Sequence, residues 1–68
     1  MRYVMKINNG YVKLQTKEIA GKPTPTINVG PIRQATVCSE EQIQAIGQEV
    51  YHYAKEIHNT LVEVIIVL

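Results

Sequence analysis

The chain has 68 residues, seven Lys and Arg against six acidic residues, and neither Phe nor Trp. This length suits a single domain spanning 1–68, with a small core of aliphatic side chains. One cysteine excludes an intrachain disulfide, and the near-neutral charge provides no basic stripe for duplex DNA. A lone cysteine fits a reducing compartment, and neither a secretory leader nor an apolar run of ~20 residues is recognised. We therefore expect a soluble cytoplasmic protein with no membrane partner.

Residues 2–7 and 11–14 alternate between apolar and polar side chains around an Asn-Gly pair. Such a pair between alternating runs is a strong hairpin signal, because both residues tolerate positive φ. We predict a turn at Asn9-Gly10 that places Ile7 opposite Val12 and Met5 opposite Leu14 on the core face. The opposite face then carries Arg2, Val4, Lys6, Tyr11, Lys13 and Gln15.

Residues 16–34 contain three prolines and two glycines. Structureless segments of this length are uncommon in compact domains and tend to be functional or disordered. Two interpretations remain open: a long connection with a partly ordered tip, or a protruding arm that grips a partner through Ile27 and Val29.

A helix is predicted from about 40 to about 57. Ser39 and Gln42 have the spacing of a capping box, and Cys38 and Ile43 that of a hydrophobic staple. Asn59 suits the left-handed position at the end of the helix. The apolar stripe of this helix comprises Ile43, Ile46, Gly47, Val50, Ala54 and Ile57, and we expect its glycine to allow close approach to a sheet.

The last eight residues carry apolar side chains on both faces of a predicted strand, with Glu63 as the exception. Strands of this kind are usually buried on both sides, whereas one helix covers only one side of a sheet. We expect this strand in the sheet interior or paired with its copy, because an exposed apolar edge promotes aggregation.

The order of elements predicts an α+β domain of two layers, with one helix on an antiparallel or mixed sheet of three or four strands, in the order β-β-(β)-α-β. Its outer face, opposite the helix, combines apolar and basic side chains, as many interfaces do. We expect a non-enzymatic module that binds a protein partner and forms a homo-oligomer. The predicted partner-binding residues are Val4, Lys6, Tyr11, Lys13, Ile27, Val29, Ile65 and Val67.

No motif for catalysis, metal or cofactor binding is recognised. His52 and Glu56 share a helix face, but two ligands do not make a zinc site. Cys38 lies beside a helix N-terminus, and the staple explains it without a catalytic role. An alternative function is binding of single-stranded nucleic acid through Arg2, Lys6, Tyr11 and Lys13, with phosphate contacts and one stacking ring. Salt dependence distinguishes it from apolar protein docking.

The hairpin Tyr3-Val-Met-Lys-Ile-Asn-Asn-Gly-Tyr-Val-Lys13 and the helix entry Gln34-Ala-Thr-Val-Cys-Ser-Glu-Glu41 resemble small accessory proteins of phages and prophages in Gram-positive bacteria. The resemblance covers about half the chain. The sequence departs from the family pattern in its Pro-rich middle and its apolar tail. It implies a protein of the host cytoplasm that binds and inhibits a host or defence protein, as inhibitors of CRISPR nucleases do.

Overall fold

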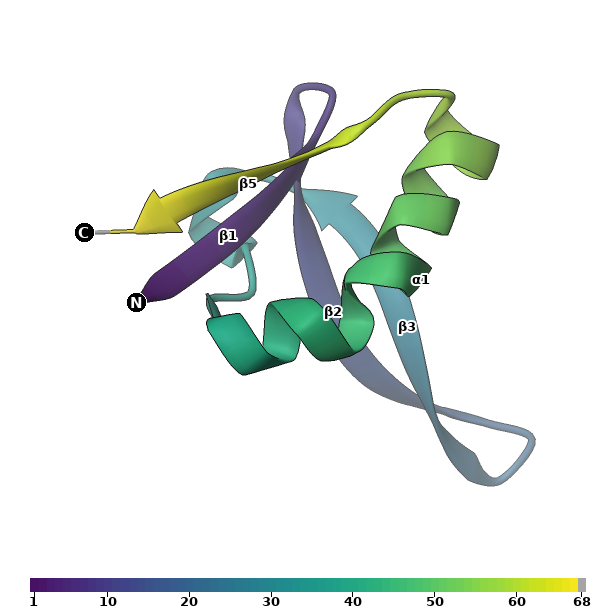
Figure 1. The fold of residues 1–68 in the computed structure, drawn as a ribbon. Coiled ribbons are helices and arrows are strands. Elements are labelled where there is room, and N and C mark those ends of the chain that lie inside the picture. The colour runs from purple at the N-terminus through teal and green to yellow at the C-terminus, as the bar shows by residue number, and fades with distance from the viewer. Residues whose placement is uncertain (68) are drawn as a thin grey trace.

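The computed structural model describes residues 1–67, which form an antiparallel sheet of five strands with one helix packed on it (Figure 1). This confirms the predicted α+β fold class, and residues 22–30 supply a further long strand. The elements in chain order are β1 Arg2–Ile7, β2 Gly10–Ile19, β3 Lys22–Gly30, a 3₁₀ turn at Ile32–Gln34, β4 Cys38–Ser39, α1 Glu40–His58 and β5 Val62–Val67.

Strand β1 lies at the centre of the sheet and has three partners. Its whole length pairs with β5, from Arg2 opposite Val67 to Ile7 opposite Val62. Its pairing with β2 is limited to the hairpin end, and its pairing with β4 to Arg2 and Tyr3. Because a strand has two edges, β2 and β4 share the edge opposite β5.

The first hairpin forms, but its predicted register is wrong. The turn occupies Asn8 and Asn9, so that Ile7 pairs with Gly10 and Lys6 with Tyr11. Asn8 takes the positive φ of 55°, which asparagine tolerates better than most residues. The shift from the predicted register is two residues, and side chains alternate with a period of two. The predicted faces of both strands are therefore preserved.

The segment before the helix fills the gap where β1 and β2 diverge. The amide of Thr36 donates to the Val12 carbonyl at 3.1 Å, and the Thr36 hydroxyl accepts from the Leu14 amide at 2.8 Å. Two residues later, β4 continues this pairing along β1. Thr36 thus satisfies Val12 and Leu14 on the edge of β2 that β1 leaves free.

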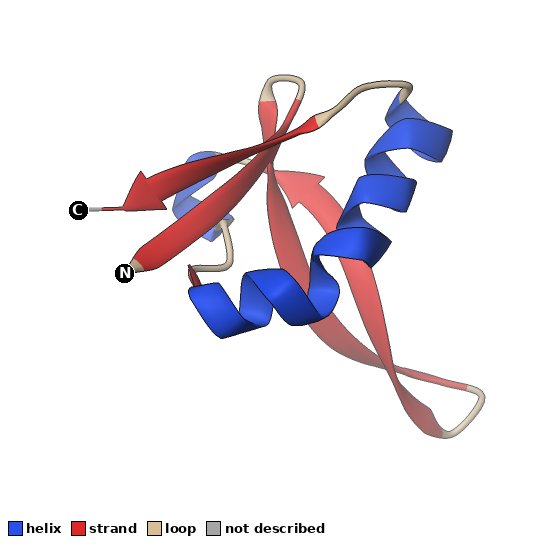
Figure 2. Ribbon diagram, viewed as in Figure 1, coloured by secondary structure: helices blue, strands red, loops and turns tan. Residues whose placement is uncertain are grey.

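Residues 16–34 do not form a loose connection, so that interpretation is wrong. The tip of this segment does project beyond the helix (Figure 1), but Ile27 and Val29, predicted to grip a partner, pack against the core. Strands β2 and β3 pair continuously from Tyr11 opposite Gly30 to Ile19 opposite Lys22 (Figure 2). Ala20 and Gly21 form the turn, with φ of 53° and 78°. Two positive φ values are what the favoured two-residue hairpin turns require, although alanine adopts this conformation at a cost of roughly 1 kcal/mol.

The two prolines of β3 fit because, within residues 1–67, β3 is a sheet edge that pairs with β2 alone. Proline has no N–H, so a sheet accepts it where that N–H would point away from the neighbouring strand. Pro23 and Pro25 are two residues apart and therefore remove donors from the same, open side of β3. This edge is poorly suited to receive another strand.

Helix α1 begins with the predicted capping box. The Ser39 hydroxyl accepts from the Gln42 amide at 3.2 Å, and the Ser39 amide donates to the Gln42 side-chain oxygen at 2.8 Å. Asn59 ends the helix in the left-handed conformation, with φ of 51°. Both ends of the helix therefore lie where local sequence predicts them.

The core lies between α1 and the two hairpins. Helix residues Val50 and Ala54 are fully buried against Met5, Ile7 and Val12. Cys38 belongs to the same cluster, together with the predicted staple partner Ile43 at its edge. Ile57, predicted within the apolar stripe, is instead exposed, because the sheet does not extend to the last turn of α1.

Two glycines have opposite surroundings. A Cβ on Gly10 would clash with the Val29 side chain, so the contact of β2 with β3 requires glycine here. A Cβ on Gly47 would meet no atom within 4 Å. The prediction that Gly47 allows a close approach of α1 to the sheet is therefore wrong.

Candidate interaction surface on strand β5

Strand β5 forms the second edge of the sheet. It pairs with β1 over six residues and has no strand on its other side within residues 1–67. The prediction of an interior position for this strand is therefore wrong within one chain. Unlike β3, this edge carries neither proline nor lysine, and its one charged residue is Glu63. An edge without such protection can pair with another strand.

The helix side of β5 is only partly covered. Val64 lies opposite Met5, so it shares the face on which α1 packs, and Ile66 follows on that face. Both side chains are nevertheless 50% exposed. Figure 1 shows why, since the first half of α1 crosses on the far side of β1 from β5.

A hollow of about 260 Å³ remains between β5 and the first turns of α1. Val64 and Tyr3 line it from the sheet, and Glu40, Ile43 and Gln44 line it from the helix. Gly47 lies four residues after Ile43 and three after Gln44, on the same side of α1. Because Gly47 has no side chain, α1 projects less far on this side.

The sequence predicts an interface on the face of the sheet opposite the helix. For Val4, one of the predicted contact residues, the structure contradicts this prediction. Val4 is only 6% exposed, so it belongs to the interior instead of a surface. Ile65 and Val67 lie on the same face as Val4 and are partly buried. The most exposed apolar side chains of β5 are Val64 and Ile66, on the helix side.

Two further predicted contact residues, Ile27 and Val29, pack against the core from β3. They face α1 together with Leu14, and they do not project from an arm. The exposed part of the hairpin is its distal half around Ile19 and Lys22, which extends beyond the helix (Figure 1).

The basic side chains of the first hairpin are only partly exposed. Lys6 and Tyr11 are directly opposite each other, and the lysine ammonium lies 6.0 Å from the centre of the tyrosine ring. This distance allows a weak cation–π interaction. Lys13 is partly buried on the same face, whereas Arg2 is exposed at the far end of β1. The ring face beside Lys6 is thus not free for stacking on a base.

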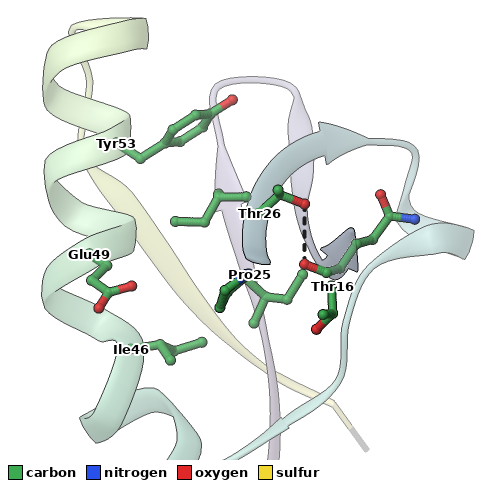
Figure 3. A pocket seen from close by; sticks show the side chains of 9 residues that line it. Thr16, Pro25, Thr26, Ile46, Glu49 and Tyr53 are labelled. Carbon is green, nitrogen blue, oxygen red and sulfur yellow. Dashed lines mark hydrogen bonds between the residues drawn. The ribbon is translucent and has the colours of Figure 1, made fainter. Parts of the chain in front are cut away.

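A second recess of about 330 Å³ lies between α1 and the β2–β3 hairpin (Figure 3). Ile46, Glu49 and Tyr53 face it from the helix, and Pro25 and Thr26 from β3. The Thr26 hydroxyl already donates to the Gln15 carbonyl at 3.1 Å. The recess is mainly apolar, and its walls include core side chains such as Leu14 and Ile27.

The single cysteine of the chain is held away from solvent. Cys38 is fully buried, and its thiol lies 3.7 Å from the Thr36 carbonyl. Burial raises the pKa of this thiol, which opposes formation of the nucleophilic thiolate. Within residues 1–67, no group of three or more His, Cys, Asp and Glu is placed to hold a metal ion. In the same range, α1 is not apolar enough along its length to cross a membrane.

Comparison with family models, curated proteins and solved structures finds no match to this chain.

The sequence identifies β5 as an interaction strand but favours the face of Ile65 and Val67, which is the less exposed of its two faces. The sequence predicts that the apolar stripe of the helix packs on one face of residues 61–68, and it assigns Ile65 and Val67 to the other, open face. The outcome depends on the crossing of α1 and β1, which side-chain periodicity does not specify. The two prolines of β3 were the available signal that β3 forms one edge.

Proposed function

We propose that this chain is a non-enzymatic protein-interaction module that receives a strand of its partner at the free edge of β5. The observation that carries the proposal is the difference between the two sheet edges. Pro23 and Pro25 block β3, whereas β5 offers unpaired main-chain groups over six residues. Strand addition to an open edge is a common mode of protein recognition.

Side chains on β5 add an apolar contribution to the main-chain hydrogen bonds. Val64 and Ile66 are half-exposed, and the hollow beside Val64 can receive a side chain of the added strand. In strand addition, main-chain bonds supply affinity and such recesses supply specificity. The resemblance to phage accessory proteins adds host and defence proteins to the candidate partners.

The nucleic-acid alternative gains no support from the basic hairpin face, because Lys6 lies over the ring of Tyr11. The two functions differ in their response to salt. Apolar strand addition should weaken little between low and high salt, whereas phosphate contacts weaken steeply.

Site-specific photo-crosslinking in cells tests the proposal. A photoreactive phenylalanine analogue replaces Ile66 in one variant and Ile19 in another. The two isoleucines are exposed to similar extents, 50% and 53%, but Ile19 lies at the hairpin tip. We expect protein adducts at position 66 and few at position 19. Equal adducts at both positions, or none at position 66, would overturn the proposal.

The purified partner from these adducts then allows a quantitative test. Ile66→Lys should weaken binding about tenfold or more, because it places a charge against an apolar contact. Ile19→Lys is the matched control and should leave the affinity unchanged.

A further inference from the structure

We infer that the strand added to β5 is β5 of a second copy of this chain, in antiparallel orientation about a two-fold axis. The inference rests on the proposed function and names its partner. Strand β5 provides both halves of the contact, since each copy presents the same open edge and the same apolar residues. Such an isologous interface is the commonest kind in homodimers.

The position of its single charge favours antiparallel pairing of β5 with itself. A parallel in-register pair would place Glu63 directly opposite its copy, where like charges are destabilising. An antiparallel pair centred on Ile65 instead places Glu63 opposite Val67 and Val64 opposite Ile66. The two carboxylates then lie at opposite ends of the contact.

This pairing covers the apolar side chains that one chain leaves open. Val64 and Ile66 share a face, so each meets the other from the second copy across the new pair. The two-fold axis is perpendicular to the sheet, which places both α1 helices on the same side. The hollows beside Val64 therefore adjoin along the helix side of the joined sheet.

The other edge of the sheet explains why the assembly stops at two copies. After β5 pairs with β5, the outermost strands of the joined sheet are both β3. Each of these strands carries Pro23 and Pro25 on its open side and resists further pairing. The dimer is thus a closed assembly with protected edges.

Sedimentation equilibrium of the full chain over a wide concentration range tests the inference. We expect the wild type and Ile19→Lys to form dimers with the same dissociation constant. Ile66→Lys should weaken the dimer about 100-fold, because its roughly tenfold effect occurs twice across a two-fold axis. A wild type that stays monomeric at millimolar concentration would overturn the inference, as would an unchanged dissociation constant for Ile66→Lys.

Cysteine scanning provides a second test that does not depend on the stability of Ile66→Lys. Single cysteines at positions 64, 65 and 66 are introduced into Cys38→Ala, with Ile19→Cys as control. Residues directly opposite in an antiparallel pair have Cα atoms about 4.5–5.5 Å apart, within disulfide range. In the pair centred on Ile65, only this residue lies opposite its own copy, so position 65 should form a covalent dimer much faster than position 19. Equal rates at all four positions would contradict β5 pairing.

The cellular crosslinking distinguishes this inference from the proposed function. Adducts at position 66 with the mass of two copies support both the proposed function and self-pairing of β5. Adducts of other masses, with no dimer in solution, leave the proposed function standing and overturn self-pairing. The absence of any adduct at that position overturns both.

Discussion

At the scale of single residues, two glycines illustrate how little the residue type says without its surroundings. Gly10 was assigned to a turn and Gly47 to a close contact between helix and sheet. The structure supports neither role, since Gly10 begins β2 and lies against Val29 of β3, whereas Gly47 faces open space. Their substitutions should therefore have opposite effects.

We expect Gly47→Ala to raise the free energy of unfolding by about 1 kcal/mol, because alanine is the better helix former and its methyl group meets no atom. Gly10→Ala should lower it by about 1–3 kcal/mol, because the added methyl group overlaps Val29. Urea unfolding followed by circular dichroism measures both. A loss of stability in Gly47→Ala would show that this side of α1 is covered in solution.

Burial of the Cys38 thiol makes the stability of the chain depend on pH. The pKa of this thiol is raised above the ordinary value of 9.0 by desolvation, so the folded chain holds the thiol proton at a pH where the unfolded chain releases it. The unfolded state then binds fewer protons, and the free energy of unfolding falls as pH rises above about 9, by at most ~1.4 kcal/mol per pH unit.

Urea unfolding at several pH values between 8 and 10.5 measures this effect. Tyrosine and lysine residues also titrate in this range, so the comparison is with Cys38→Ala, which keeps their contribution. The difference in stability between the wild type and Cys38→Ala should shrink as pH rises. A constant difference would contradict the predicted effect of burial on the thiol.

At the scale of elements, the features that neighbouring residues specify could be predicted from the sequence. The features that depend on contacts between distant segments could not. The capping box, the helix end at Asn59 and the faces of the first hairpin follow from neighbouring residues and from periodicity. The divergence of β1 from β2 does not, because it depends on Thr36 reaching both Val12 and Leu14 from far along the chain. The regular β2–β3 hairpin was missed because proline normally argues against a strand.

The hydroxyl of Thr36 holds the edge of β2 at Leu14. Thr36→Val keeps the shape of the side chain but leaves the Leu14 amide without its acceptor, at a cost of roughly 1–3 kcal/mol. Thr36→Ser retains the hydroxyl and should cost less. Hydrogen exchange should show faster exchange of the Leu14 amide in Thr36→Val alone. Equal exchange in both variants would mean that the hydroxyl does not hold this strand edge.

At the scale of the whole molecule, the protection of one sheet edge and the openness of the other determine what the chain can assemble into. With one open edge, self-association ends at a pair of chains; with two, each chain can add a neighbour on either side. Under the inferred self-pairing, the number of chains in the assembly depends on Pro23 and Pro25 as much as on β5.

Replacement of both prolines by threonine tests this directly. Pro23→Thr with Pro25→Thr restores two main-chain donors on the open side of β3, so we expect light scattering to show species larger than the dimer. Pro31→Thr, outside the sheet, is the control and should retain the wild-type mass. Adding Ile66→Lys to the double variant closes the β5 edge and should return the assembly to a pair, now joined through β3. Species of unlimited size in this triple variant would show that growth does not proceed by edge pairing, and an unchanged mass in the double variant would show that the prolines do not set its limit.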